Sequence, residues 1–234
     1  MTTRHITHHG TPLQVAGDPS ASRAVIVLQE AFGVNDHIRD VTERFAAAGY
    51  YAVAPELFHR TGSQEVAYDN FPDAMAAMAE LSKDGLSEDL HEAAQFLEEA
   101  GFPAVSRAIV GFCMGGSVSF YACTLGIVGA GASFYGGGVA TGRFGLAPLL
   151  ELAPHLTSAW LGLYGDLDKG IPIDQVEDLR AAVAATGQVT ELIRYPDADH
   201  GFHCDGRPAV FNASAAADAY QRTLNFFEQN LISK

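Results

Sequence analysis

The sequence predicts an α/β protein with a doubly wound, mostly parallel sheet and helices on both faces. Short apolar segments, rich in β-branched or aromatic residues and bounded by Gly, Pro or Asp, alternate with segments of helical period. Several of the short segments are apolar on both faces, as the centre of a parallel sheet requires. Strands that alternate with helices imply right-handed crossovers between parallel neighbours. The expected strands cover residues 24–30, 50–57, 107–112, 131–137, 159–166 and 189–197.

The helical segments are recognised by the spacing of their apolar residues. Ile38, Val41 and Phe45 are spaced by one helical turn, and Gly49 follows as a residue that favours the end of a helix. The same spacing recurs within residues 86–97 and 220–231. We therefore expect these segments to pack as helices against the sheet.

The opening segment, residues 5–17, is expected to form a β-hairpin at the edge of the sheet. Gly10 lies in the middle of this segment. Glycine suits a tight turn because it accepts positive φ angles.

Length and composition narrow the classes of function. The chain has 234 residues, which suits one core, and no change in composition divides it, so we expect a single domain over residues 1–234. Hydrophobic residues make up 48% and charged residues 18%, which argues against disorder. The net charge of -14 would repel nucleic acid and anionic membrane surfaces. The expected partner is a small molecule, and self-association is left open.

The cysteines indicate the cellular compartment. Cys113, Cys123 and Cys204 are too few, and odd in number, for the disulfide framework of a small secreted scaffold. The N-terminus lacks the apolar run of a signal peptide, and no segment offers about 18 uninterrupted apolar residues for a membrane span. The expectation is a cytoplasmic protein with free thiols.

The segment RAIVGFCMGGSVSFYA, residues 107–122, places Cys113 between a strand and a possible helix. Gly111, Cys113 and Gly115 form the pattern GxCxG, a nucleophile elbow with cysteine where serine is commoner. The glycines relieve crowding in a sharp strand-to-helix turn. The following helix would favour a thiolate, and the backbone N–H of Met114 would face a developing oxyanion. A buried structural cysteine in a glycine-rich turn is the alternative interpretation of this pattern alone.

A thiol nucleophile needs a base and an acid, which in this fold follow it along the chain. Asp166 and Asp168 come just after one expected strand, and His200 and His203 come after the next. Asp168 is favoured because it lies further into the loop. His200 is favoured because it begins its loop and is followed by glycine.

No metal site or cofactor is expected. His203 and Cys204 are adjacent, but no further ligands stand nearby at a known spacing. Glu30 is a more unusual residue, because it ends an apolar strand at the carboxyl edge of the sheet. Beside an elbow, Glu30 is a candidate second base, although a surface glutamate at a strand terminus is the plainer interpretation.

Together these residues resemble the dienelactone hydrolase family. The similarity runs through LQEAFGVNDHIRDVTERFAAAGYYAVAPELFHR near the start, GFCMGG in the middle, then YGDLDKGIP, and DADHGFHCD near the end. The resemblance implies an α/β-hydrolase fold and a Cys, His and Asp triad that cleaves the lactone of a dienoic acid in the breakdown of aromatic compounds. It implies Cys113 as the nucleophile, Asp168 as the acid and His200 as the base.

The resemblance also implies roles for the residues around this triad. Glu30 would interact with the resting thiol and take its proton once substrate binds. The backbone N–H groups of Ala31 and Met114 would form the oxyanion hole. The reaction would pass through a thioester acyl-enzyme, and His200 would direct water for its hydrolysis.

The sequence departs from the family where the substrate carboxylate would bind. Family members are thought to hold it with two arginines, one in the helical segment before the elbow strand and one shortly after the histidine. Residues 61–106 contain no Arg, and Cys204 stands four positions after His200, so Arg207 is the nearest substitute. Loss of bidentate contacts would weaken the binding of an acidic substrate.

The expected function is a cysteine-dependent hydrolase of a lactone or activated ester, similar to carboxymethylenebutenolidase. One alternative is a small-ester carboxylesterase with a different substrate. Another is a catalytically silent member of the fold that binds a ligand. A thiol switch at Cys113 is disfavoured, because no resolving cysteine is adjacent in sequence.

Overall fold

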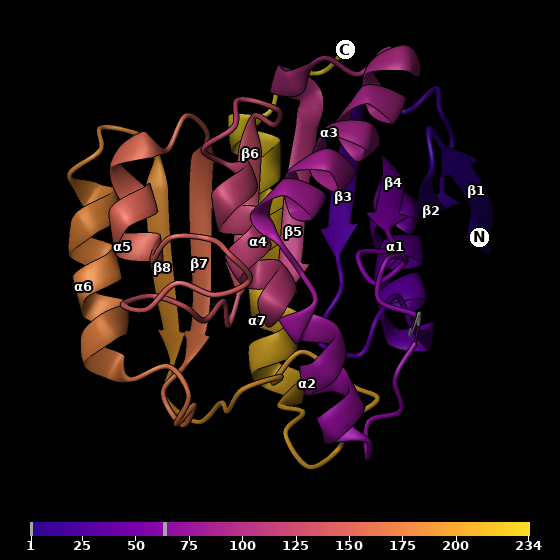
Figure 1. The fold of residues 1–234 in the computed structure, drawn as a ribbon. Coiled ribbons are helices and arrows are strands. Elements are labelled where there is room, and N and C mark those ends of the chain that lie inside the picture. The colour runs from indigo at the N-terminus through magenta and orange to yellow at the C-terminus, as the bar shows by residue number, and fades with distance from the viewer. Residues whose placement is uncertain (1, 63–64) are drawn as a thin grey trace.

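The computed structural model describes residues 2–62 and 65–234, which form a sheet of eight strands (Figure 1). The spatial order is β1-β2-β4-β3-β5-β6-β7-β8. Strands β1 and β2 pair antiparallel with each other, and β2 also pairs antiparallel with β4. The six strands β3 to β8 are parallel to one another, which confirms the predicted mostly parallel sheet. The strands are β1 (Arg4–His8), β2 (Thr11–Ala16), β3 (Arg23–Leu28), β4 (Tyr50–Pro55), β5 (Arg107–Phe112), β6 (Ala130–Phe134), β7 (Ala159–Gly165) and β8 (Thr190–Tyr195).

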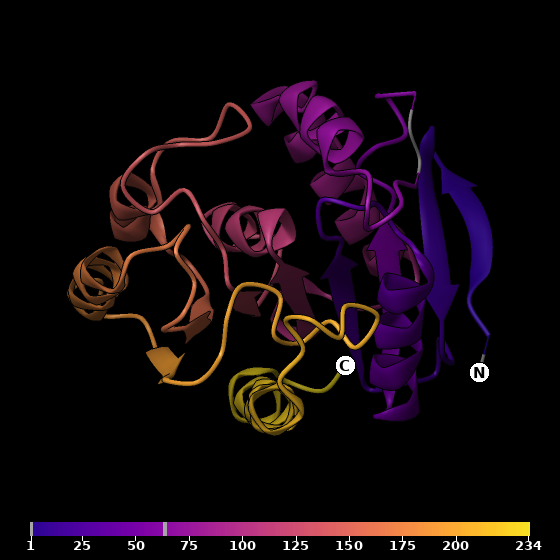
Figure 2. The same ribbon diagram turned by 90° about the horizontal axis from the view of Figure 1, so that it is seen from below.

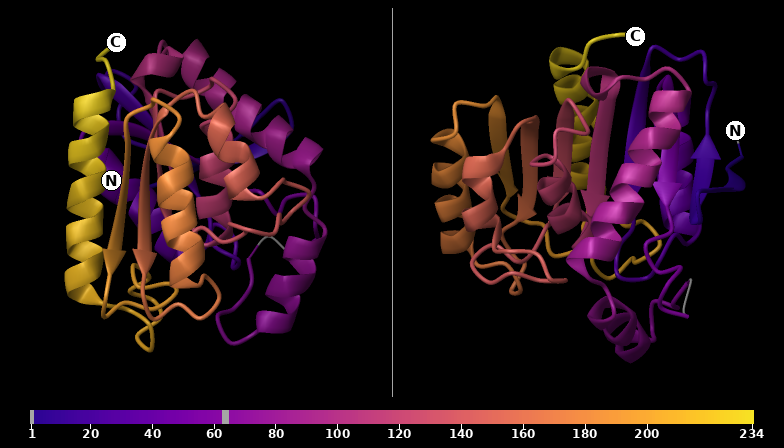
Figure 3. Two further views of the ribbon diagram at one scale, coloured as in Figure 1. Left: turned by 90° about the vertical axis from the view of Figure 1, so that its left-hand side faces the viewer. Right: turned by 45° about the horizontal axis from the view of Figure 1, so that its top comes forward.

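Helices cover both faces of the sheet, as expected of an α/β-hydrolase fold. Helices α1 and α7 lie on one face, and α3, α4 and α6 lie on the other (Figure 2). The side view in Figure 3 shows α7 and α6 on opposite sides of the strands. The helices are α1 (Asp36–Ala47), α2 (Phe71–Ala79), α3 (Lys83–Glu99), α4 (Met114–Ala122), α5 (Leu149–Leu152), α6 (Ile173–Ala184) and α7 (Ala213–Asn230), with short 3-10 turns at Ala104–Ser106 and Ala153–His155.

The apolar pattern of the central strands reflects burial on both faces. Every residue of β4, β5 and β6 is buried, and so is all of β3 beyond Arg23. The β1–β2 hairpin forms the edge of the sheet, and Gly10 in its turn has a φ of +100°. None of the helices described here is long and apolar enough to cross a membrane.

The carboxyl ends of the parallel strands meet at one edge of the sheet, the lower edge in Figure 1. Helix α2 and the loop between β8 and α7 lie beside this edge. In an open parallel sheet, ligands bind outside the carboxyl ends of the strands. The loops at this edge are therefore the place to look for a functional site.

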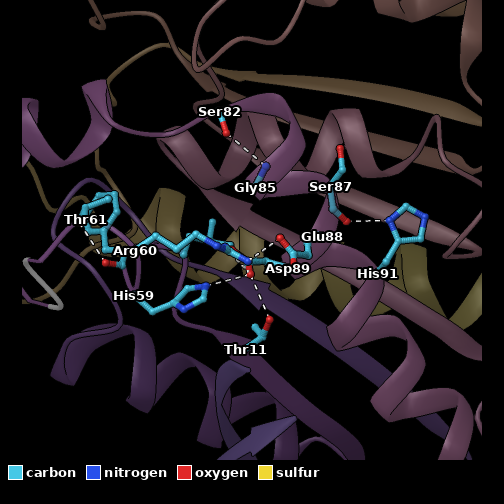
Figure 4. Close-up of polar contacts among 12 residues, drawn as sticks. Thr11, His59, Arg60, Thr61, Ser82, Gly85, Ser87, Glu88, Asp89 and His91 are labelled. Carbon is cyan, nitrogen blue, oxygen red and sulfur yellow. Dashed lines mark hydrogen bonds and ion pairs between the residues drawn. The ribbon is translucent and has the colours of Figure 1, made fainter. Parts of the chain in front are cut away.

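A buried carboxylate joins helix α3 to the neighbouring strand β2 and to the segment after β4 (Figure 4). Asp89 is almost fully buried, and its Oδ1 accepts hydrogen bonds from Thr11 Oγ1 at 3.1 Å and from His59 Nε2 at 3.0 Å. Arg60 Nη1 donates to both carboxylate oxygens of Asp89 at 2.7 Å. The network joins α3 to β2 and to the segment that follows β4.

We expect Asp89→Ala to lower the free energy of unfolding by about 3 kcal/mol, because the buried donors around it lose their acceptor. Glu88→Ala is the matched control, since Glu88 also pairs with Arg60, at 2.9 Å, but its side chain is 63% exposed. The control should lose less than about 1 kcal/mol. Urea denaturation measures both, and equal losses would contradict the structural role of Asp89.

Candidate active site

The strained turn expected at Cys113 is present between β5 and α4. Cys113 has a φ of +56° and a ψ of -115°, a conformation that residues other than glycine rarely adopt. A Cβ atom on Gly111 would lie 1.9 Å from the carbonyl oxygen of Gly115. A Cβ atom on Gly115 would lie 2.5 Å from the carbonyl oxygen of Gln29. Glycine at both positions therefore permits the close packing that the turn requires.

The turn leaves Cys113 partly exposed at the N-terminus of α4, where the helix dipole favours a negative charge. In the described part of the chain, no backbone carbonyl outside the helices and strands accepts a hydrogen bond from the N–H of Ala31 or Met114. Both residues line the same cavity as Cys113. This set of groups can hold an anionic sulfur and an anionic oxygen side by side.

His200 and Asp168 meet in the loops that follow β8 and β7. His200 Nδ1 donates to Asp168 Oδ2 at 2.6 Å. The other oxygen of Asp168, Oδ1, accepts from the backbone N–H of Gly170 at 2.8 Å. Burial on its own would lower the pKa of His200, but its interactions with Cys113 and the hydrogen bond to Asp168 outweigh burial and hold the pKa well above its ordinary value. The three side chains line one cavity.

The two alternative residues are engaged elsewhere. Arg194 donates two hydrogen bonds to the carboxylate of Asp166, at 2.7 and 2.8 Å. His203 points into the core, where its ring packs against Phe112 and Phe134 at centroid distances of 4.9 and 5.1 Å. Burial lowers the pKa of His203 to about 3, so this imidazole stays neutral.

Cys204 is also buried, beside the site but outside the cavity. Its Sγ lies 3.3 Å from the hydroxyl of Tyr68. Burial and the negative charge of Glu30 raise the pKa of Cys204 to about 12. Cys204 is therefore a neutral thiol, in a poor state to bind a metal or to act as a nucleophile.

Glu30 is buried at the end of β3, next to the site. Its Oε1 accepts a hydrogen bond from the hydroxyl of Tyr135 at 2.9 Å. Its Oε2 is buried and has no hydrogen-bond partner within the described ranges. Burial and the charge of Glu30 raise the pKa of Tyr135 well above its usual value, so the phenol remains a donor. Glu30 therefore has one oxygen held and one oxygen available for a proton.

The cavity at Cys113 has a volume of about 240 Å³ and mostly apolar walls. Helix α2 contributes Phe71, Met75 and Met78 to these walls, and the loop after β6 contributes Phe144. A wider hollow of about 630 Å³ lies nearby, but neither Cys113 nor His200 lines it. The smaller cavity, which fits a small substrate with an apolar body, is the candidate active site.

Two arginines line this cavity. Arg207 was expected from the sequence, and its guanidinium lies 5.4 Å from the centre of the Phe32 ring. Arg143, in the loop after β6, was not expected, because it lies outside residues 61–106, the segment in which the resemblance places the second arginine. Its position after an expected strand was the available signal. Neither guanidinium has an ion-pair partner among the residues described by the structure, so both are free to bind an anionic group.

A family model, similar sequences and a similar solved structure all point to the same family and the same fold. The family model described as "Dienelactone hydrolase family" matches residues 12–231. A protein of Escherichia coli O157:H7 named "Putative carboxymethylenebutenolidase" is 37% identical, over 95% of this chain and 81% of its own length. A protein of Synechocystis sp. with the same name is 36% identical, over 98% and 97%. The crystal structure titled "Putative Dienelactone Hydrolase" from Klebsiella pneumoniae has a TM-score of 0.86 and 33% identity, covering 97% of both chains.

Asp168→Asn should lower the pKa of His200 toward its ordinary value, because the mutation removes a negative charge and the carboxylate acceptor of Nδ1. Titration of the imidazole signals by NMR measures this change. Asp166→Asn is the matched control, since Asp166 pairs with Arg194 and makes no contact with His200. A shift of the same size in the control would show that Asp168 does not hold this imidazole.

Proposed function

Because this chain belongs to the dienelactone hydrolase family, we propose that it hydrolyses a lactone or activated ester by means of a cysteine nucleophile. The observation that carries the proposal is the His200–Asp168 hydrogen bond of 2.6 Å, in the same cavity as Cys113 at its strained turn. A silent binding protein has no need for this arrangement. A thiol also suits substrates with good leaving groups better than amides.

In the proposed first half-reaction, the Cys113 thiolate attacks the substrate carbonyl and forms a carbon–sulfur bond. The backbone N–H groups of Ala31 and Met114 stabilise the oxyanion. The carbon–oxygen bond then breaks, and the departing enolate or alkoxide takes a proton from His200. The product of this half-reaction is a thioester.

In the proposed second half-reaction, His200 takes a proton from water, and the resulting hydroxide attacks the thioester. Asp168 holds the imidazole in the orientation that this step needs and stabilises its positive charge. The carbon–sulfur bond breaks, and Cys113 leaves as a thiolate. Glu30 then returns its proton to this thiolate, which restores the resting thiol.

Glu30 is proposed as the base that accepts the thiol proton when substrate arrives. The support is its buried oxygen Oε2, which has no hydrogen-bond partner in the described part of the chain, while Tyr135 fixes Oε1. A thiol that stays protonated until then is less exposed to oxidation and alkylation.

The substrate is proposed to be a small lactone that carries a carboxylate. Arg207 and Arg143 supply positive charge to a cavity whose walls are otherwise mostly apolar, in a chain of net charge -14. These arginines would replace the contacts that the sequence lacks between residues 61 and 106. A neutral small ester, cleaved by the same machinery, is the alternative substrate.

Cys113→Ala should lower kcat/KM for a nitrophenyl ester by about 10⁴-fold or more, as the loss of a nucleophile does in related machinery. Intact-mass spectrometry of the wild type, quenched during turnover, should show an acyl adduct at Cys113. Cys123→Ala is the control, since Cys123 is a buried thiol at the C-terminal end of α4, away from the cavity. Turnover near the wild-type rate in Cys113→Ala would disprove the assignment of Cys113 as the nucleophile.

Arg207→Ala should raise KM by about 10- to 100-fold for an acidic dienelactone, because a charge-assisted, bidentate contact is lost. KM for a neutral nitrophenyl ester should change much less. Arg143→Ala tests the second guanidinium in the same way, and Arg222→Ala is the control, since Arg222 pairs with Asp218 on α7. Equal effects on both substrates would remove the carboxylate-binding role and favour the neutral ester.

A further inference from the structure

A second cluster of chemically active side chains lies at the edge of the sheet, between the β1–β2 turn and helix α3. His8 Nδ1 and His9 Nδ1 face the same oxygen, Glu92 Oε2, at 3.1 and 3.0 Å. The two rings lie 4.1 Å apart, centre to centre. The ligand-type atoms of His8, His9 and Glu92 all lie within 4.8 Å of one another. The cluster lies outside the cavity that holds Cys113.

The turn places two consecutive side chains on the same side of the chain. In a strand, neighbouring side chains point to opposite faces. Here His9 and Gly10 both have positive φ angles, +46° and +100°, which is the pattern of a type I′ hairpin turn. Asn or Asp is the usual residue at the first position of such a turn, because these residues tolerate the left-handed conformation, which is strained for most other side chains. Histidine at this strained position brings its ring beside His8 and toward Glu92.

The spacing suits a tetrahedral metal ion. Two ligands that each lie about 2.1 Å from an ion are separated by about 3.4 Å at the tetrahedral angle. The separations of 3.0 and 3.1 Å between each ring nitrogen and Glu92 Oε2 are close to this value. A cation among the three atoms would replace protons now shared between the rings and the carboxylate.

The second nitrogen of His8 also has a partner suited to a metal site. His8 Nε2 lies 3.2 Å from Glu99 Oε2, and Glu99 lies about two helical turns beyond Glu92 on α3. A histidine that binds a metal through one nitrogen commonly donates its other N–H to a carboxylate, which fixes the tautomer and the ring orientation. The side chain of His8 is 12% exposed and that of His9 is 57% exposed, so the site is largely buried on one side and open to solvent on the other.

We propose that His8, His9 and Glu92 form a binding site for a divalent transition-metal ion, with Glu99 orienting His8. Two imidazoles and one carboxylate are a ligand set that suits Zn²⁺, and the open side leaves a position for water. A bound ion would fasten the edge hairpin to α3. Its contribution would be to stability, because the site is separate from the cavity that holds Cys113.

The test uses the full chain without an affinity tag, stripped of metal by chelation, and ZnCl₂ as the probe. Calorimetry should show one Zn²⁺ bound per chain, and thermal unfolding should shift upward with Zn²⁺. Glu92→Gln and His9→Asn should weaken binding at least tenfold and abolish the thermal shift. Asn is chosen because it suits the hairpin turn, so the fold is retained.

Two controls exclude other zinc-binding groups. His91→Ala removes an exposed histidine beside Glu92 on α3, and Cys113→Ala removes the thiol in the cavity; both variants should bind Zn²⁺ as the wild type does. Co²⁺ in place of Zn²⁺ should give no thiolate-to-metal charge-transfer band. Absence of binding, binding that survives in His9→Asn, or binding that is lost in Cys113→Ala would each overturn the proposal.

Discussion

The close approach of helix α4 to the end of strand β3 is the constraint on which the rest of the site depends. A Cβ atom on Gly115 would lie 2.5 Å from the carbonyl oxygen of Gln29 and 2.7 Å from that of Leu28. This contact sets Cys113 beside the segment that carries Glu30 and Ala31. One steric condition therefore brings together a thiol, a carboxylate and backbone donors that are far apart in the sequence.

Burial and hydrogen-bond partners place similar residues around this contact in different environments. His200 is held by Asp168 and faces the cavity, whereas His203, three positions later, is neutral and packed among aromatic rings. Asp166, two positions before Asp168, forms an ion pair with Arg194. Neighbouring residues of the same type thus differ in their partners and in their exposure, and this difference decides which of them can take part in chemistry.

The sheet and the elbow could be predicted from the sequence because local rules determine them. Strands buried on both faces are apolar throughout, and the turn at Cys113 needs glycine on either side. Helix α2 escaped prediction because it buries only Ala74 and Ala77, which gives too weak a periodic pattern. Arg143 and the partnership of Tyr135 with Glu30 depend on contacts between distant segments, which no local pattern encodes.

Because of helix α2, the wall of the cavity can change in evolution independently of the elbow. Its few buried residues attach this helix to the fold. Phe71 is 58% exposed and Met75 is 49% exposed, and both line the cavity without being part of the elbow. Substitutions at these two positions alter the shape of the wall without disturbing Gly111, Gly115 or the strand ends. The range of molecules accepted by this chain can therefore diverge from that of its relatives while the inherited reaction is preserved.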